Sequence, residues 1–121
     1  MLNGIKKFLQ EAGIFYFCTA DKAPHCRPFG AVAEIDGRLY FSTADTKSVY
    51  RELVANPLVQ IVACKPSGEW IRVDGKAVVD GRESSRRAML DACPVLLNHY
   101  KSPSDRGFAV FYLTDVSVER F

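Results

Sequence analysis

Apolar residues recur along the chain with two different spacings. Those at helical spacing near the start are Leu2, Ile5, Phe8 and Leu9. Because Gly13 follows them, the pattern predicts a short amphipathic helix over residues 2–12. The next segment, 14–20, is aromatic and apolar, a composition that favours a strand.

A second strand is expected over residues 25–35, with an interruption at Pro28 and Gly30. Proline lacks a ladder donor and glycine permits unusual dihedrals, so the interruption predicts a bulge or a close backbone approach. The pair Asp36-Gly37 is a strong hairpin signal, and residues 39–43 form the returning strand.

The second half of the chain continues with short elements. We expect helices over 44–55 and 83–92, strands over 59–65 and 69–79, an irregular or short-helical segment over 95–106, and a hairpin of 108–114 and 116–121 around Asp115. Short strands at hairpin spacing with few helices favour a mainly β fold, a small antiparallel barrel of six to seven strands.

Composition limits the classes of function. The 121 residues suit a single domain, 1–121, and 16 Lys and Arg against 14 Asp and Glu leave a formal charge of +2. This near-neutral balance indicates no basic face for nucleic acid or an anionic membrane. The apolar runs are far shorter than the ~20 residues that span a bilayer. The first ten residues lack an apolar signal core, so we expect a cytoplasmic protein.

The chain has four cysteines and no Cys-x-x-Cys pair. Cys18 and Cys64 lie in apolar runs and are expected to be buried strand residues, and disulfides are not expected without a secretory signal. The set considered for zinc is His25, Cys26, Cys93 and His99. Its spacing matches no metal module, so no metal site is predicted.

The most informative segment runs from a strand end into a helix start. Ser42 and Thr43 end the strand, and Thr46, Lys47 and Ser48 begin the helix. This region combines the free N–H groups of a first helical turn with a cation and several hydroxyl groups. Such a combination is typical of a phosphate-binding site. The alternative is that Asp45 or Thr46 is an ordinary N-cap and Lys47 is solvated.

The segment Arg27-Pro28-Phe29-Gly30 precedes the predicted hairpin. Pairing across the turn would place position 30 near position 43, and a planar heteroaromatic ring could lie on this backbone. Two ordinary roles remain open, a surface ion pair for Arg27 and a place in the core for Trp70.

Together these segments, with Asn56-Pro57 and the stretch from Trp70 to Ala77, resemble the pyridoxamine 5′-phosphate oxidase-like FMN-binding proteins. The resemblance covers about residues 14–80. It implies a split antiparallel β-barrel of Greek-key type, a homodimer, and FMN held without a covalent bond at the subunit interface. By position, the resemblance implies that the phosphate is held by Thr46, Lys47 and Ser48. The ribityl chain and ring would be flanked by Arg27, Pro28, Phe29, Gly30, Ser42 and Thr43. Trp70 would approach the flavin, and Tyr100 and Lys101 could reach it from the other subunit.

The chain departs from the true oxidases of this family. It lacks the C-terminal segment whose Arg and His hold pyridoxamine phosphate, and its histidines are His25 and His99, so oxidation of that substrate is not expected. The short form resembles small FMN-binding proteins of anaerobes and related flavin reductases. We therefore expect an FMN-dependent oxidoreductase with a nicotinamide or another small redox partner. The alternatives are a non-catalytic FMN carrier and a related barrel that binds a deazaflavin, or haem through a histidine.

Overall fold

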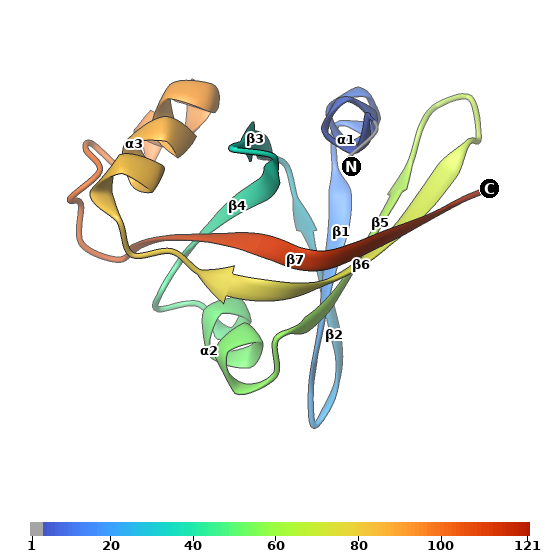
Figure 1. Ribbon diagram of the computed structural model, residues 1–121, viewed down its shortest axis with the longest axis horizontal. Helices are drawn as coiled ribbons and strands as arrows, with labels where there is room; N and C mark the ends of the chain where they lie inside the picture. The colour runs from blue at the N-terminus through green and yellow to red at the C-terminus, as the bar shows by residue number, and fades with distance from the viewer. Residues whose placement is uncertain (1–3) are drawn as a thin grey trace.

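The computed structural model describes residues 4–121 (Figure 1). The elements in chain order are α1 (Ile5–Ala12), β1 (Phe15–Asp21), β2 (Ala23–Phe29), β3 (Ala33–Ile35), β4 (Arg38–Ala44), α2 (Ser48–Ala55), β5 (Leu58–Cys64), β6 (Trp70–Val79), α3 (Glu83–Ala92), a 3₁₀ turn η1 (Pro94–Asn98) and β7 (Phe108–Arg120). Leu2, which the sequence assigned to the first helix, lies outside the described residues. None of the helices in residues 4–121 is long and apolar enough to cross a membrane.

All strands belong to one seven-stranded sheet with the order β2-β1-β5-β6-β7-β4-β3. Every neighbouring pair is antiparallel. The two edge strands, β2 and β3, are consecutive in the chain and only residues 30–32 separate them. The sheet therefore curls so that the end of β2 lies near the start of β3 without pairing to it, and the predicted mainly β, split antiparallel barrel is confirmed.

The segment predicted as one strand over 25–35 is two strands with different partners. Residues up to Phe29 pair with β1, with Phe29 opposite Phe15, whereas Ala33 begins the pairing with β4 opposite Tyr40. The change of partner coincides with the interruption that Pro28 and Gly30 predicted. β2 lies at an edge of the sheet, where a proline costs no ladder hydrogen bond.

The predicted C-terminal hairpin around Asp115 is wrong. Residues 108–120 form one long strand, and both halves pair with β6. Asp115 has φ 53°, and the ladder shifts register opposite Gly75, between Asp74 and Lys76. The irregularity bends the strand but does not reverse it, as a bulge does.

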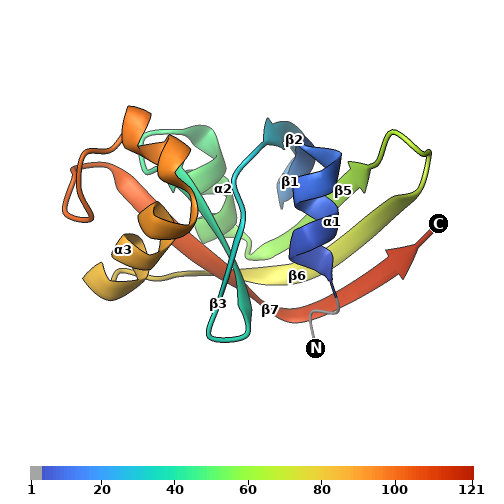
Figure 2. The same cartoon turned by 90° about the horizontal axis from the view of Figure 1, so that it is seen from above.

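Two of the helices pack their apolar side chains into the main core, and the third packs against a separate cluster. α1 and α2 lie on opposite sides of the crossing strands β6 and β7 (Figure 1), and both contribute to the main core around Phe15, Phe17 and Phe41. Seen from above, α1 lies over the β1–β5 side (Figure 2). α3 packs against β3, β4 and β7 around a second buried cluster that includes Tyr40 and Met89.

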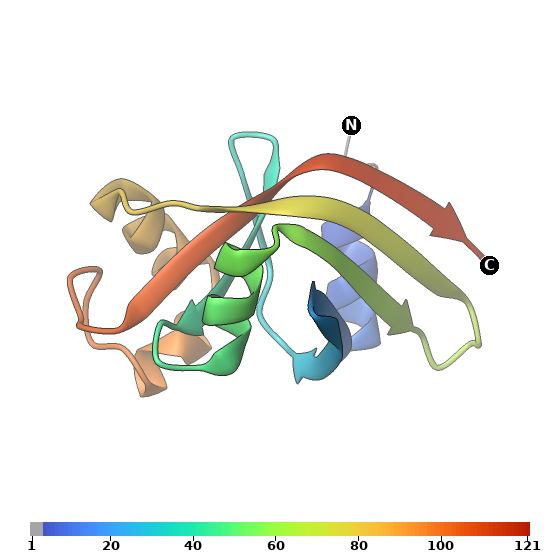
Figure 3. The ribbon, with the colours of Figure 1, turned by 90° about the horizontal axis from the view of Figure 1, so that it is seen from below.

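The helix predicted over 44–55 begins at Ser48 in the structure. Seen from below, α2 connects β4 to β5 and lies beside β6 (Figure 3). Its residues Val49 and Leu53 are buried in the main core. Because the helix starts at Ser48, the segment 45–47 forms a surface turn between the end of β4 and the helix, with the Lys47 amide donating to the Ala44 carbonyl at 3.0 Å.

Candidate functional site

The start of α2 has no side-chain cap. Lys47 occupies the N-cap position with extended backbone, φ −83° and ψ 152°, and no side chain bonds the first turn. Thr46, Lys47 and Ser48 are all exposed. Neither Asp45 nor Thr46 acts as the side-chain cap that the alternative interpretation required. We call Thr46, Lys47 and Ser48 the α2 cradle.

The α2 cradle is held by the end of β4 and the turn before β7. The Asp45 amide donates to the Gly107 carbonyl at 2.8 Å, and this fixes the turn against the start of β7. Behind the cradle, Ser42 is half-buried and Thr43 is buried. An exposed ammonium, hydroxyl groups and an uncapped helix start are a donor set that fits a phosphate ester.

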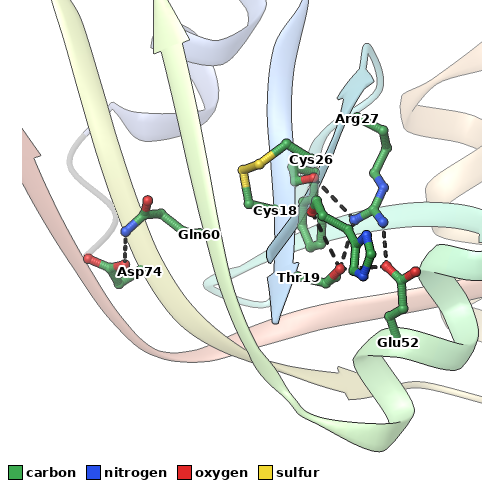
Figure 4. Close-up of a disulfide and its surroundings, with 9 residues drawn as sticks. Cys18, Thr19, Cys26, Arg27, Glu52, Gln60 and Asp74 are labelled. Carbon is green, nitrogen blue, oxygen red and sulfur yellow. Dashed lines mark hydrogen bonds and ion pairs between the residues drawn. A yellow bond between two sulfur atoms is a disulfide. The ribbon is translucent and has the colours of Figure 1, made fainter. Parts of the chain in front are cut away.

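Arg27 points to the interior side of β2 and not to the α2 cradle. Its guanidinium forms an ion pair with Glu52 of α2, and it also donates to the Phe17 carbonyl at 3.3 Å and to the Thr19 hydroxyl at 3.1 Å (Figure 4). The Thr19 hydroxyl in turn donates to Glu52 at 2.6 Å. In this chain Arg27 therefore fastens the β1–β2 hairpin to α2.

Glu52 is a residue that the sequence interpretation missed. Its side chain is only 6% exposed, although it is a carboxylate. The hydrogen bond from Thr19, followed by that from Arg27, lowers the pKa of Glu52 against the opposing effect of burial. The signal was available, because Glu52 follows Val49 by three residues and so lies on the apolar face of the helix.

The neighbours of Arg27 on β2 face two directions. Phe29 packs inside, stacked on Phe17 with ring centroids 4.8 Å apart. Pro28 and Gly30 are exposed. A Cβ built on Gly30 would meet only the Ile14 side chain, at 3.8 Å, so the backbone here is open to an approaching group. The ladder between β3 and β4 starts at Ala33, which pairs with Tyr40. The expected approach of residue 30 to residue 43 would continue this ladder past its last pair, so the pairing does not extend to it.

Trp70 lies far from the α2 cradle within one chain. It begins β6 opposite Cys64, whereas Lys76 of β6 faces Leu58 near the end of α2. Six residues of strand separate Trp70 from Lys76 by about 20 Å. The start of β6 and the turn that leads into α2 lie at opposite ends of the molecule (Figure 3). The indole stacks on Phe121 with centroids 4.0 Å apart.

The two residues considered for the other subunit, Tyr100 and Lys101, differ in their surroundings. Tyr100 packs on Phe108 with centroids 4.4 Å apart, and burial raises the pKa of its hydroxyl. Lys101 is exposed, and its amide donates to Asp105. Tyr100 is thus anchored in its own chain.

A second buried polar cluster lies at the start of α3. Asp80 accepts from the Tyr40 hydroxyl at 2.8 Å and forms an ion pair with Arg82 at 3.0 Å. The Arg82 hydrogen bonds hold the pKa of Asp80 far below its ordinary value. Because Asp80 also accepts from the Arg82 amide at 3.1 Å, the cluster fastens the loop that leads into α3. Across residues 4–121, no group of three or more His, Cys, Asp or Glu side chains could hold a metal ion.

A family model described as pyridoxamine 5′-phosphate oxidase matches residues 1–119, and a search of curated proteins gives no match. Among solved structures, a NimC/NimA family protein from Clostridium acetobutylicum is 36% identical, with 99% of this chain and 86% of that chain covered and a TM-score of 0.94.

Two more distant structures share the fold. A pyridoxamine 5′-phosphate oxidase-related, FMN-binding protein from Nostoc punctiforme is 16% identical, covering 98% of this chain and 82% of that one, with a TM-score of 0.75. A structure named F420 reductase is 16% identical, covering 94% of each chain, with a TM-score of 0.68.

We expect Glu52→Gln to destabilise the fold by about 2 kcal/mol, because it leaves the Arg27 guanidinium, 20% exposed, without a charged partner. Urea unfolding at neutral pH measures this loss. Arg51→Ala is the control, since Arg51 is 72% exposed and 3.9 Å from Glu52, and it should cost less than about 0.5 kcal/mol.

The same pair predicts a dependence on pH. The folded-state pKa of Glu52 is lowered, so its contribution is present above the unfolded pKa and is lost as pH falls through the folded value. The stability difference between wild type and Glu52→Gln should therefore shrink in acid. A difference that stays constant from neutral pH to about pH 2 would contradict the ion pair.

Proposed function

The chain belongs to the pyridoxamine 5′-phosphate oxidase family, and we propose that it binds FMN non-covalently and serves as an oxidoreductase. The observation that carries the proposal is the exposed and uncapped start of α2, where Lys47 stands at the N-cap position. When bound, FMN supplies hydride or electron transfer. The residues of the chain have the tasks of binding the group and orienting it.

In this proposal the α2 cradle holds the phosphate. The ammonium of Lys47 supplies the charge, and the hydroxyls of Thr46 and Ser48 together with the first-turn N–H groups supply hydrogen bonds. Ser42 and Thr43, at the end of β4, lie next to the cradle along the chain and are proposed to contact the ribityl chain.

The ring is proposed to lie along Pro28 and Gly30, whose backbone is exposed. Arg27 and Phe29 support this strand from its interior side, through Glu52 and Phe17 respectively. Their contribution is to position the backbone. The separation of Trp70 from the α2 cradle means that a Trp70 near the flavin would come from a second subunit.

A homodimer is part of the proposal. Several large apolar side chains are more than half exposed in the single chain, and we propose that a second copy of the chain covers some of them. Away from the outward face of β1 and β5, they are Ile14, Val54, Val95, Leu97 and Phe121. A flavin between two subunits would also be better shielded from water than one lying on the face of a single chain.

The second candidate is a deazaflavin, and the resemblance to the structure named F420 reductase favours it. FMN and a phosphorylated deazaflavin both combine a tricyclic ring with a phosphate-bearing chain, so the α2 cradle suits either. A carrier that only cycles FMN remains the alternative to an enzyme.

Purified protein incubated with FMN should retain it through gel filtration, with a flavin absorption band and quenched flavin fluorescence. Rapid consumption of NADH or NADPH by the loaded protein would identify an enzyme, and its absence with tight FMN binding would identify a carrier. Preferential binding of a deazaflavin would favour the second candidate. A protein that retains neither contradicts the proposal.

Lys47→Ala should weaken FMN binding about tenfold or more while leaving riboflavin binding within about twofold, because riboflavin lacks the phosphate. Fluorescence titration measures both constants. The matched control is Lys7→Ala, which removes the same charge from the exposed side of α1 and should leave both constants unchanged. Equal losses for the two ligands would show that Lys47 does not contact the phosphate.

Sedimentation equilibrium should give twice the 13.5 kDa chain mass for the protein loaded with FMN. The dimer follows from the exposed apolar side chains and from the distance between Trp70 and the α2 cradle. A monomer that binds FMN tightly would contradict the interface site.

A further inference from the structure

Cys18 and Cys26 face each other across the β1–β2 hairpin. They are directly paired in the ladder, their Cα atoms are 4.1 Å apart, and they form a disulfide (Figure 4). This corrects the expectation that disulfides are absent and that Cys18 is an ordinary buried residue. The other cysteines are unpaired thiols, Cys64 exposed and Cys93 buried.

The pair lies on the outward face of the hairpin. Along β1, Phe17 and Thr19 are buried and point inward, whereas Cys18 between them is half-buried and points outward. Cys26 is exposed. A disulfide that solvent reaches is open to exchange with other thiols, because the attacking thiolate needs access to sulfur.

The hairpin does not depend on the bond. Seven ladder pairs, from Phe15 opposite Phe29 to Asp21 opposite Ala23, hold its two strands in register. The sequence separation of the cysteines is 8, and closing so short a loop constrains the unfolded chain only modestly. The sulfurs are therefore held opposite each other by the backbone, and the bond can open and close without a change of fold.

A hollow of about 260 Å³ lies beside Cys18 on the same face. Cys18 forms part of its wall, Cys26 does not, and Gln60 and Asp74 line it as well. The Gln60 amide donates to the Asp74 carboxylate at 2.8 Å (Figure 4). The hollow therefore combines a disulfide sulfur with a negatively charged carboxylate.

The cations that flank Asp74 on β6 are already paired. Arg72 lies 3.2 Å from Glu119, and Lys76 lies 3.5 Å from Asp115. The charge of Asp74 is thus left to act on a molecule in the hollow. A small thiol that carries a protonated amine would be attracted, and one that carries a carboxylate would be repelled.

We propose that Cys18–Cys26 is a thiol–disulfide exchange site for small cationic aminothiols. The aminothiol thiolate attacks the Cys18 sulfur from the hollow, the bond to Cys26 breaks, and Cys26 leaves as a thiolate that takes up a proton. A second aminothiol thiolate attacks the aminothiol sulfur of the mixed disulfide and releases Cys18 as a thiol. The pair gains two electrons and two protons, and two aminothiols become one disulfide.

The first experiment follows the wild-type protein in cysteamine–cystamine mixtures, read by intact mass after acid quenching and alkylation. Cysteamine should open the pair to two alkylatable thiols, and cystamine should close it again. A pair that resists excess cysteamine under native conditions is purely structural, and one that stays reduced in cystamine does not form the bond. Either result overturns the proposal.

The second experiment tests the hollow, in a Cys64→Ser background that removes the exposed unpaired thiol. In Cys26→Ser, the remaining Cys18 should react about tenfold faster with cystamine than with dithiodiglycolate, after correction for the rates with free cysteine. The matched variant Cys18→Ser leaves Cys26. For Cys26, the ratio of the corrected rate with cystamine to that with dithiodiglycolate should be near one.

Asp74→Asn, added to Cys26→Ser, should bring the Cys18 ratio close to one, because it removes the charge and keeps the amide shape. Circular dichroism confirms that each variant is folded. A ratio that is the same for Cys18 and Cys26, or that survives Asp74→Asn, would show that the hollow does not select the thiol. The readouts need no flavin, so this proposal and the proposed function fail or succeed separately.

Discussion

The constraint on which the structure depends is that the two edges of its sheet are neighbours in the chain. β2 and β3 lie at opposite ends of the strand order, yet residues 30–32 join them. A flat sheet cannot satisfy both conditions, because its seven strands at about 4.8 Å spacing would place the edges about 30 Å apart. The sheet must curl, and curling encloses the main core and leaves the exposed Pro28 and Gly30 backbone at the split.

α2 connects this closed sheet to the candidate site. Its apolar face, with Val49 and Leu53, is part of the barrel core, so the helix cannot shift without disturbing that core. Glu52 on the same face is tied to Thr19 and Arg27 of the edge hairpin. The position of the helix start, where the α2 cradle lies, is therefore set by packing and by one buried ion pair, and not by a capping side chain.

Local patterns predicted most of the elements, because period and turn chemistry are local properties. The strand interruption at Gly30 and the hairpin at Asp36-Gly37 are examples. What failed depended on partners distant in sequence. Asp115 resembles a hairpin turn, but the pairing of both flanks with β6 makes it a bulge. For Arg27, local patterns left an ion pair open but could not identify its partner, because Glu52 is 25 residues away.

The Arg27–Glu52 pair also bears on anion binding at the α2 cradle, although Arg27 does not reach the cradle. Glu52 lies one turn from Ser48, about 6 Å along the helix axis. A lone carboxylate there would oppose the positive end of the helix dipole and repel a phosphate. Arg27 neutralises that charge from the interior side, where it is shielded from water, so Glu52 does not oppose the action of the dipole and Lys47 on an anion. An arginine that fastens the hairpin thus serves the proposed site through the electrostatics of α2.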